Sequence, residues 1–145
     1  MFTGEYRHSI DDKNRLIIPS KYRDNLYGKI VITRGLDGCL FGYNIETWNK
    51  LLEKLNTLPF TKKDARNFTR FLTSGAITLE FDKQGRVVIP SYLKEYASIM
   101  KEVVLVGVVN RIEIWSKDSW DSFINDNVES LSDISENLFD SSFEL

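Results

Sequence analysis

The sequence has 145 residues and a formal net charge of −2, and its 42% hydrophobic and 28% charged residues are typical of a folded globular protein. No apolar run reaches the roughly 18–20 residues that a membrane span needs, and the N-terminus lacks the basic-then-apolar pattern of a signal peptide. The single cysteine, Cys39, excludes an internal disulfide and a cysteine-rich zinc site. We therefore expect a cytoplasmic protein with neither a membrane partner nor a bound metal.

Charge is unevenly distributed along the chain. No lysine or arginine follows Lys117, and residues 121–145 contain seven acidic residues. Residues 1–120 hold all 19 basic residues and the other 14 acidic ones, which gives this part a net charge of +5. The total charge would argue against a nucleic-acid partner, but the basic part permits one. The acidic C-terminal tail, 121–145, is typical of a mobile extension or a weak terminal helix, with apolar residues for docking on a neighbour at Leu131, Leu138, Phe139 and Phe143.

The sequence also repeats itself. Residues 11–20, DDKNRLIIPS, match residues 82–91, DKQGRVVIPS, at an offset of 71 residues. Residues 35–48 match residues 107–120 at an offset of 72 residues, with a tryptophan at the end of both blocks. Because two separate blocks match in the same order, we interpret the chain as an internal duplication.

Each copy begins with the same predicted β-hairpin. A strand runs up to Asp11 in the first copy and up to Asp82 in the second. The following Asp-x-x-Asn or Asp-x-x-Gly predicts a tight turn, because Asn14 and Gly85 are residue types that tolerate a positive φ. A second strand is then expected to return along the first, with an arginine at the exit of the turn.

A short helix, two apolar strands and a closing helix complete each copy. A proline after the hairpin cannot continue a central strand but suits the first turn of a helix. The periodicity of apolar residues predicts the first closing helix and a further helix that links the copies, with no clear equivalent after the second closing helix. In order, we expect strands 6–10 and 15–18, helix 20–26, strands 29–33 and 39–43, helices 46–56 and 62–72, strands 76–81 and 86–89, helix 91–97, strands 102–106 and 111–115, and a last helix.

These elements predict a mostly β fold with peripheral helices, an α+β protein built from two β-β-α-β-β-α repeats as a small barrel or as paired sheets. Each copy alone has too little core-forming sequence for comfortable stability, so we expect the two copies to share one core. The expected organisation is a first repeat at 5–48, linking helices at 49–74, a second repeat at 75–120 and the acidic tail at 121–145.

The motifs resemble those of the MraZ family. D-x-K-x-R-L-x-I-P near the N-terminus, T-R-G-L-D-G-C-L-F-G-Y followed by E-T-W, and a second D-x-x-G-R-x-x-I-P carry this resemblance from Met1 to about Trp120. Asn14 departs from the glycine usual in the family but tolerates the same backbone. The resemblance implies tandem SpoVT/AbrB-type domains in a pseudo-twofold swapped-hairpin β-barrel, and nothing is carried over to the acidic tail.

The same resemblance implies a DNA-binding transcriptional regulator. The family is associated with the promoter of the bacterial division and cell-wall gene cluster, where it recognises short repeated boxes and commonly represses. It also implies a ring-shaped homo-oligomer, with one tandem chain in place of an AbrB-type dimer. We therefore expect a nucleoid-associated protein whose partners are double-stranded DNA and further copies of itself, without a cofactor or a small-molecule substrate. The alternative is an AbrB-like or antitoxin-type module whose main partner is another protein.

The arginines at the hairpin exits are the main candidate DNA contacts. A guanidinium can pair with O6 and N7 of guanine or bind phosphate, and a two-stranded ribbon fits the major groove. The aspartate of each turn is expected to cap the turn and orient the arginine. The candidate DNA-contacting residues are Arg15, Arg86, Lys13, Lys83, Arg7, Lys21 and Arg23, and the motif-orienting residues are Asp11, Asp82, Asn14 and Gly85.

Other groups have ordinary structural interpretations. The basic side chains between residues 50 and 70 form a solvated helix face, contact phosphate, or face acids on a neighbouring subunit. We expect the aromatic residues at repeat-equivalent positions, Tyr43, Trp48, Trp115 and Trp120, to pack in the core. Cys39 is expected to be a buried thiol.

An enzyme is not expected. A carboxylate cluster for metal-assisted hydrolysis, made of Asp11, Asp12, Glu80 and Asp82, is conceivable. However, each motif aspartate is closely followed by a basic residue, and the single histidine, His8, has no metal-ligand spacing. The sequence also contains neither G-x-S-x-G nor a phosphate-binding loop.

Overall fold

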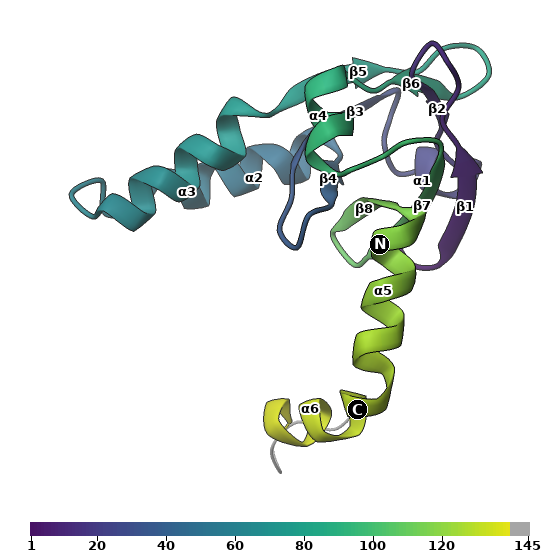
Figure 1. The fold of residues 1–145 in the computed structure, drawn as a ribbon. Helices are drawn as coiled ribbons and strands as arrows, with labels where there is room; N and C mark the ends of the chain where they lie inside the picture. Colours follow the sequence, from purple (N-terminus) through teal and green to yellow (C-terminus); the bar gives the residue numbers. More distant parts are fainter. Residues whose placement is uncertain (140–145) are drawn as a thin grey trace.

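A six-stranded antiparallel sheet organises the computed structural model, which describes residues 1–139 (Figure 1). A separate two-stranded ribbon lies against it, made of β2 (Arg15–Ile17) and β6 (Arg86–Val88). In spatial order the strands of the sheet are β1 (Glu5–Ser9), β7 (Glu102–Val108), β8 (Arg111–Ser116), β4 (Leu40–Tyr43), β3 (Lys29–Arg34) and β5 (Ile77–Glu80). The fold is therefore mixed α+β, as predicted.

The helices begin at recognisable signals. Asn44 and Ser116 are N-caps whose side chains accept hydrogen bonds from backbone N–H groups, of Thr47 at 2.8 Å and of Ser119 at 3.1 Å. None of the helices in residues 1–139 is long and apolar enough to cross a membrane. The helices are α1 (Ser20–Arg23), α2 (Ile45–Asn56), α3 (Lys63–Ser74), α4 (Ser91–Tyr96), α5 (Lys117–Asn127), the 3-10 helix η1 (Val128–Ser130) and α6 (Leu131–Leu138).

The two sequence copies exchange strands. β1 of the first copy pairs with β7 of the second, and β5 of the second copy pairs with β3 of the first. The predicted turn forms, since Asn14 N–H donates to the Asp11 carbonyl at 2.9 Å. However, β2 does not return along β1, because its hydrogen-bonded partner is β6. The predicted pairing within each hairpin is wrong, because an apolar pattern specifies the face of a strand but not its partner.

The sheet has twofold symmetry in its strand order. When each strand is replaced by the equivalent strand of the other copy, the same order results, read from the other edge. Equivalent residues face each other at two centres: Leu16 lies opposite Val87 in the ribbon, and Phe41 lies opposite Glu113 in the sheet. The sheet is not closed into a barrel, since β1 and β5 are its two edges. The reason is that the chain leaves the sheet after each edge strand and uses its next strand, β2 or β6, in the separate ribbon.

Both faces of the sheet are buried, and both cores contain residues of both copies. On one face, sheet residues such as Ile32 and Ile114 pack with the ribbon, α1 and α4. On the other face, Trp115 and its neighbours pack under α2, α3 and α5. The predicted core aromatics are confirmed, since Tyr43, Trp48, Trp115 and Trp120 are all buried.

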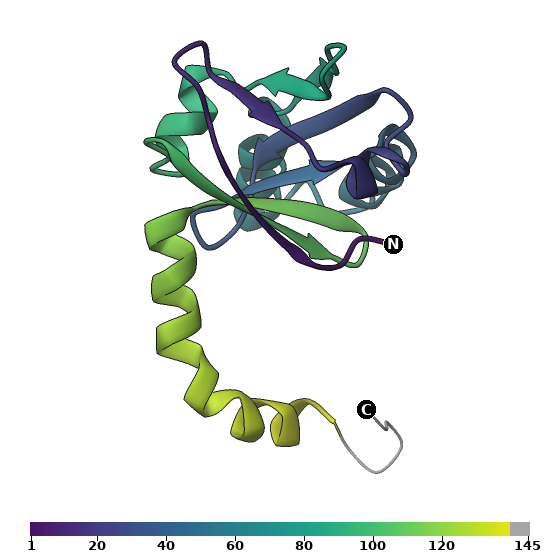
Figure 2. The same cartoon turned by 90° about the vertical axis from the view of Figure 1, so that its right-hand side faces the viewer.

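The acidic segment begins within α5 and continues through η1 and α6 away from the sheet, as Figures 1 and 2 show. α5 is held at its base, where the Trp120 ring lies 5.4 Å from the Trp115 ring. Asp121 there accepts hydrogen bonds from Arg7 at 3.0 Å and from Lys117 at 2.9 Å. Of the two alternatives for the tail, residues 121–138 are thus helical, and Phe143 lies outside the described residues.

Candidate nucleic-acid interface

The ribbon presents one polar and aliphatic face to solvent. Because side chains alternate along a strand, Leu16 and Val87 point into the core and are completely buried, and their neighbours point outward. Arg15 lies opposite Val88 and Ile17 lies opposite Arg86. Ile17 is 41% exposed and Val88 is 55% exposed, which is unusual for strand aliphatics. We call the outward residues Arg15, Ile17, Arg86 and Val88 the ribbon face.

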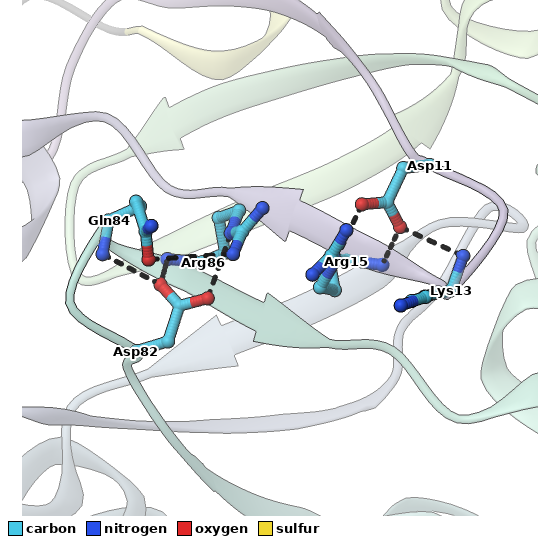
Figure 3. A network of polar contacts seen from close by, with 6 residues as sticks. All are labelled: Asp11, Lys13, Arg15, Asp82, Gln84 and Arg86. Carbon is cyan, nitrogen blue, oxygen red and sulfur yellow. Dashed lines mark hydrogen bonds and ion pairs between the residues drawn. The ribbon is translucent and has the colours of Figure 1, made fainter.

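Each end of the ribbon carries an aspartate turn that holds an arginine (Figure 3). In the first turn, Asp11 Oδ1 accepts hydrogen bonds from the backbone N–H groups of Lys13 at 3.0 Å and Arg15 at 2.8 Å. Asp11 Oδ2 accepts from Arg15 Nε at 2.6 Å. The same carboxylate therefore shapes the turn and orients the arginine that leaves it.

The second turn repeats this arrangement. Asp82 Oδ1 accepts from the backbone N–H groups of Gln84 at 2.9 Å and Arg86 at 2.8 Å, and Oδ2 accepts from Arg86 Nε at 2.8 Å. Figure 3 shows the two turns at opposite ends of the ribbon with the two arginines between them. Because the two strands run antiparallel, one turn of each copy contributes one arginine to the same face.

The aspartates occupy only one side of each guanidinium. The terminal amino groups of Arg15 have no hydrogen-bond acceptor within residues 1–139, and Arg86 Nη2 has Gln84 Oε1 at 3.4 Å. The backbone N–H groups of Arg15 and Arg86, and then the ion pairs, hold the pKa of Asp11 and Asp82 below the usual range. Both turns therefore contain carboxylates at neutral pH, and both arginines are charged and oriented.

A basic residue from each short helix supports the turn of the other copy. Arg23 of α1 donates from Nε to the Ile18 carbonyl at 2.8 Å and lies directly against Gly85. At the equivalent position of α4, Lys94 Nζ donates to Asn14 Oδ1 at 3.1 Å. This explains why the two copies differ: Gly85 leaves space for a guanidinium, whereas Asn14 supplies an acceptor for an ammonium group.

The structure groups some of the predicted residues and separates another. The side chains of Lys13 and Lys83 are exposed on the turns, and Lys21 is exposed on α1 directly after the ribbon. Arg7 lies on β1 and binds Glu5 and Asp121, each at 3.0 Å, so it is engaged at the base of α5 and not at the ribbon.

Sequence reasoning missed three residues here: Ile17, Val88 and Lys94. The position of Lys94, 71 residues after Arg23, was a usable signal. Its partner turn follows only from the strand exchange.

Comparison with known families adds one result. Two adjoining stretches, residues 1–71 and 72–142, each match the family model described as "MraZ protein, putative antitoxin-like". The chain belongs to the MraZ family. The double match confirms the tandem duplication, and the two matched stretches are as long as the offset between the repeated motifs. The second match continues to residue 142, so residues 121–142 of the acidic segment lie within the second MraZ unit. The expectation that the resemblance ends near Trp120 is wrong.

MraZ is a regulatory and antitoxin-like family. The structure also places the other side chains that the sequence analysis considered. Cys39 is buried as predicted, and burial raises the pKa of its thiol above the ordinary value. His8 lies on β1 opposite Val103. Within residues 1–139 no group of three or more His, Cys, Asp or Glu side chains is placed to hold a metal ion.

Gly85 provides a prediction specific to the turns of this MraZ-family chain. Its φ is +77°, and a Cβ atom there would lie 2.5 Å from Arg23 Cζ. Gly38 has the same φ of +77° with nothing within 4 Å of a Cβ, so it is a matched control. We expect Gly38→Ala to lower the free energy of unfolding by about 1–2 kcal/mol. Gly85→Ala should cost more, because Arg23 must also leave its bond to Ile18.

Urea denaturation measures both losses. The excess cost of Gly85→Ala should disappear when both variants are compared in an Arg23→Ala background. Equal losses in the wild-type background would mean that Arg23 does not support the second turn.

Proposed function

We propose that this MraZ-family chain is a sequence-specific DNA-binding transcriptional regulator that contacts DNA through the ribbon face. The observation that carries the proposal is the pair of oriented arginines, one from each copy, on the outward face of the ribbon. A guanidinium that is already oriented loses less freedom when it pairs with O6 and N7 of guanine. A two-stranded ribbon is narrow enough for the major groove, and the aliphatic side chains of Ile17 and Val88 suit the methyl group of thymine.

In this proposal the residues around the ribbon face contact phosphates. Lys13 and Lys83 extend from the two turns, and Lys21 and Arg23 follow on α1. Phosphate contacts give affinity and position the protein, whereas base contacts give specificity. Arg7 lies apart from the ribbon face, on β1 beside Glu5 and Asp121, so its predicted phosphate contact would be made outside that face.

One chain offers few positive charges, so we propose that several subunits act together. The acids of the turns offset part of the basic charge there, and a lone site would bind weakly. A ring of subunits, each an AbrB-like swapped-hairpin unit made from one tandem chain, would meet repeated DNA boxes with higher avidity and without new contacts. The proposed target is the promoter of the bacterial division and cell-wall gene cluster, with repression as the outcome.

A second candidate function is that of an antitoxin-type module whose main partner is another protein. The family description names antitoxins, and Ile17 and Val88 are exposed aliphatic residues at the centre of the ribbon face. Such residues also suit the apolar core of a protein interface. A protein partner of this kind would give no preference between DNA sequences.

Binding to promoter duplexes across a salt series tests the proposal. We expect the wild type to bind a duplex with tandem boxes at least about tenfold more tightly than a duplex with one box, because linked sites add avidity. The affinity should fall linearly with salt on logarithmic axes. A scrambled duplex of equal length is the control. Equal affinity for scrambled and tandem-box DNA would contradict sequence-specific recognition, and equal affinity of dissociated protomers and assembled protein for tandem boxes would contradict the multivalent mechanism.

A further inference from the structure

Within residues 1–139, the acidic segment forms an arm that packs on the sheet only through the base of α5, where Trp120 and Phe123 contact Trp115. We call residues 117–138, from α5 to α6, the C-terminal arm. Leu131, Ile134 and Leu138 lie on one face of α6 and are 53%, 40% and 72% exposed. The arm is also strongly acidic: after Lys117 it has no basic residue, and its acids are Asp118, Asp121, Asp126, Glu129, Asp133 and Glu136. A short helix with an exposed apolar face is marginal alone, which indicates a partner surface.

An open groove lies between α2 and α3, which cover the same face of the sheet as the base of α5. It has a volume of about 410 Å³ and an apolar lining that includes Leu52, Leu55, Leu58 and Phe60, of which Phe60 is 79% exposed. Arg66 and Arg70 of α3 also line it. Residues 45–74 hold six basic and three acidic residues, so this helix pair has a net charge of +3. The groove is thus apolar inside and basic along its length.

The arm and the helix pair are equivalent parts of the two MraZ units. Ile45, the first residue of α2, corresponds to Lys117, the first residue of α5, at the offset of 72. In the first unit the chain turns back after α2, and α3 lies beside it (Figure 1). In the second unit the chain continues through η1 into α6 without folding back onto α5 (Figure 2). The duplication has therefore produced one helix pair with an open groove and one arm without a partner.

We propose that the arm of one chain docks in the α2–α3 groove of a second copy, with the apolar face of α6 against the groove. The argument is charge and shape complementarity: an acidic amphipathic helix meets a basic apolar groove, a recurrent mode of helix recognition. The arm does not reach its own groove, because α5 is anchored on the sheet through Trp120 and from there points away from α2 and α3 (Figures 1 and 2).

This contact joins two different surfaces of identical chains. Such head-to-tail contacts generate rings when the rotation closes and open filaments when it does not. The arm and the groove would thus be the two surfaces that join neighbouring subunits in the proposed ring. This rests on the assembly part of the proposed function and not on DNA binding. It also gives a role to the basic residues between 50 and 70, as partners of acids on a neighbouring subunit.

Charge reversal on either surface tests the inference without DNA. The mass in solution is measured by sedimentation velocity over a concentration series at low and high salt. We expect Arg66→Glu/Arg70→Glu in the groove, and Asp133→Lys/Glu136→Lys in the arm, each to raise the subunit dissociation constant by about 100-fold or more. The wild-type assembly should weaken as salt is raised. Lys29→Glu/Lys101→Glu makes the same charge change as the groove variant at exposed residues outside both surfaces, and it should keep the wild-type mass.

Mixing the two disrupted variants gives a sharper result. The groove variant keeps a native arm and the arm variant keeps a native groove, and the reversed arm and the reversed groove are again opposite in charge. The mixture should therefore regain assemblies in which the two variants alternate, although each variant alone does not assemble. A wild type that stays monomeric, a groove variant with wild-type mass, or a mixture that does not assemble would overturn the inference. Assembly that depends on the arm, in a protein that binds no promoter DNA, would instead contradict the proposed function alone.

Discussion

Removing both arginines of the ribbon face should weaken binding to tandem-box promoter DNA by about 100-fold or more. Each bidentate arginine–guanine pair contributes about 1–3 kcal/mol of discrimination. The loss of two such pairs therefore corresponds to a decrease in affinity of about 100-fold or more. The fold should tolerate Arg15→Ala/Arg86→Ala, because both side chains are partly exposed and surface ion pairs contribute little to stability. The turns remain closed, because the backbone N–H groups of residues 15 and 86 still donate to the Asp11 and Asp82 carboxylates.

Fluorescence anisotropy of a labelled duplex, combined with the mass of the DNA-free protein, measures this effect. Lys29→Ala/Lys101→Ala removes the same charge elsewhere on the surface and should bind as the wild type. Arg15→Lys/Arg86→Lys retains charge but loses the planar fork, so it should keep most of the salt dependence and lose the preference for boxes. Unchanged affinity of a correctly folded alanine double variant would place the DNA contact outside the ribbon face.

Truncating the buried side of the same ribbon should have the largest effect on stability. Leu16 is completely buried between the ribbon and the sheet and lies opposite Val87 at the centre of the ribbon. We expect Leu16→Ala to lower the free energy of unfolding by about 2–5 kcal/mol, because it loses apolar burial and leaves a cavity. The neighbouring Ile17 points outward, so Ile17→Ala should change the free energy of unfolding by less than about 0.5 kcal/mol.

Urea denaturation of the two variants measures this difference at one fixed protein concentration, because assembly adds to the apparent stability. Both substitutions lie on the same three-residue strand, so the two losses can be compared directly. Equal losses for Leu16→Ala and Ile17→Ala would mean that the ribbon does not lie against the sheet with this face. It would also remove the structural basis of the ribbon face.

Local sequence signals predicted the elements of the fold well. The observed bounds of all eight strands differ from the expected ones by at most two residues, and the turn residues Asn14 and Gly85 have positive φ, as predicted. These features depend on local backbone preferences and on the alternation of apolar residues, which a sequence shows directly. The pairing of strands from different copies depends on contacts between residues about 50–100 positions apart, and there the prediction of β2 against β1 was wrong.

The candidate site divides in the same way. The arginine after each turn and the aspartate that binds it are four residues apart, so the motif contains both partners. The support of Asn14 by Lys94 joins residues 80 positions apart and follows only from the exchange of strands. The hydrogen bond from Arg7 to Asp121 is likewise a tertiary contact. The sequence places Arg7 close to the first turn and does not show this partner.

By itself the sequence determined that this chain is two copies of one unit, a basic part with net charge +5 and an acidic tail of seven acids. Only the tertiary structure decided how these charges are used. Strand exchange places one arginine of each copy on a single ribbon face, and the unequal helical ends of the two units leave one basic groove and one acidic arm on each chain. The physical reason is that charge and periodicity are local properties, whereas the burial of both sheet faces by both copies selects which strands meet and which helices remain without a partner.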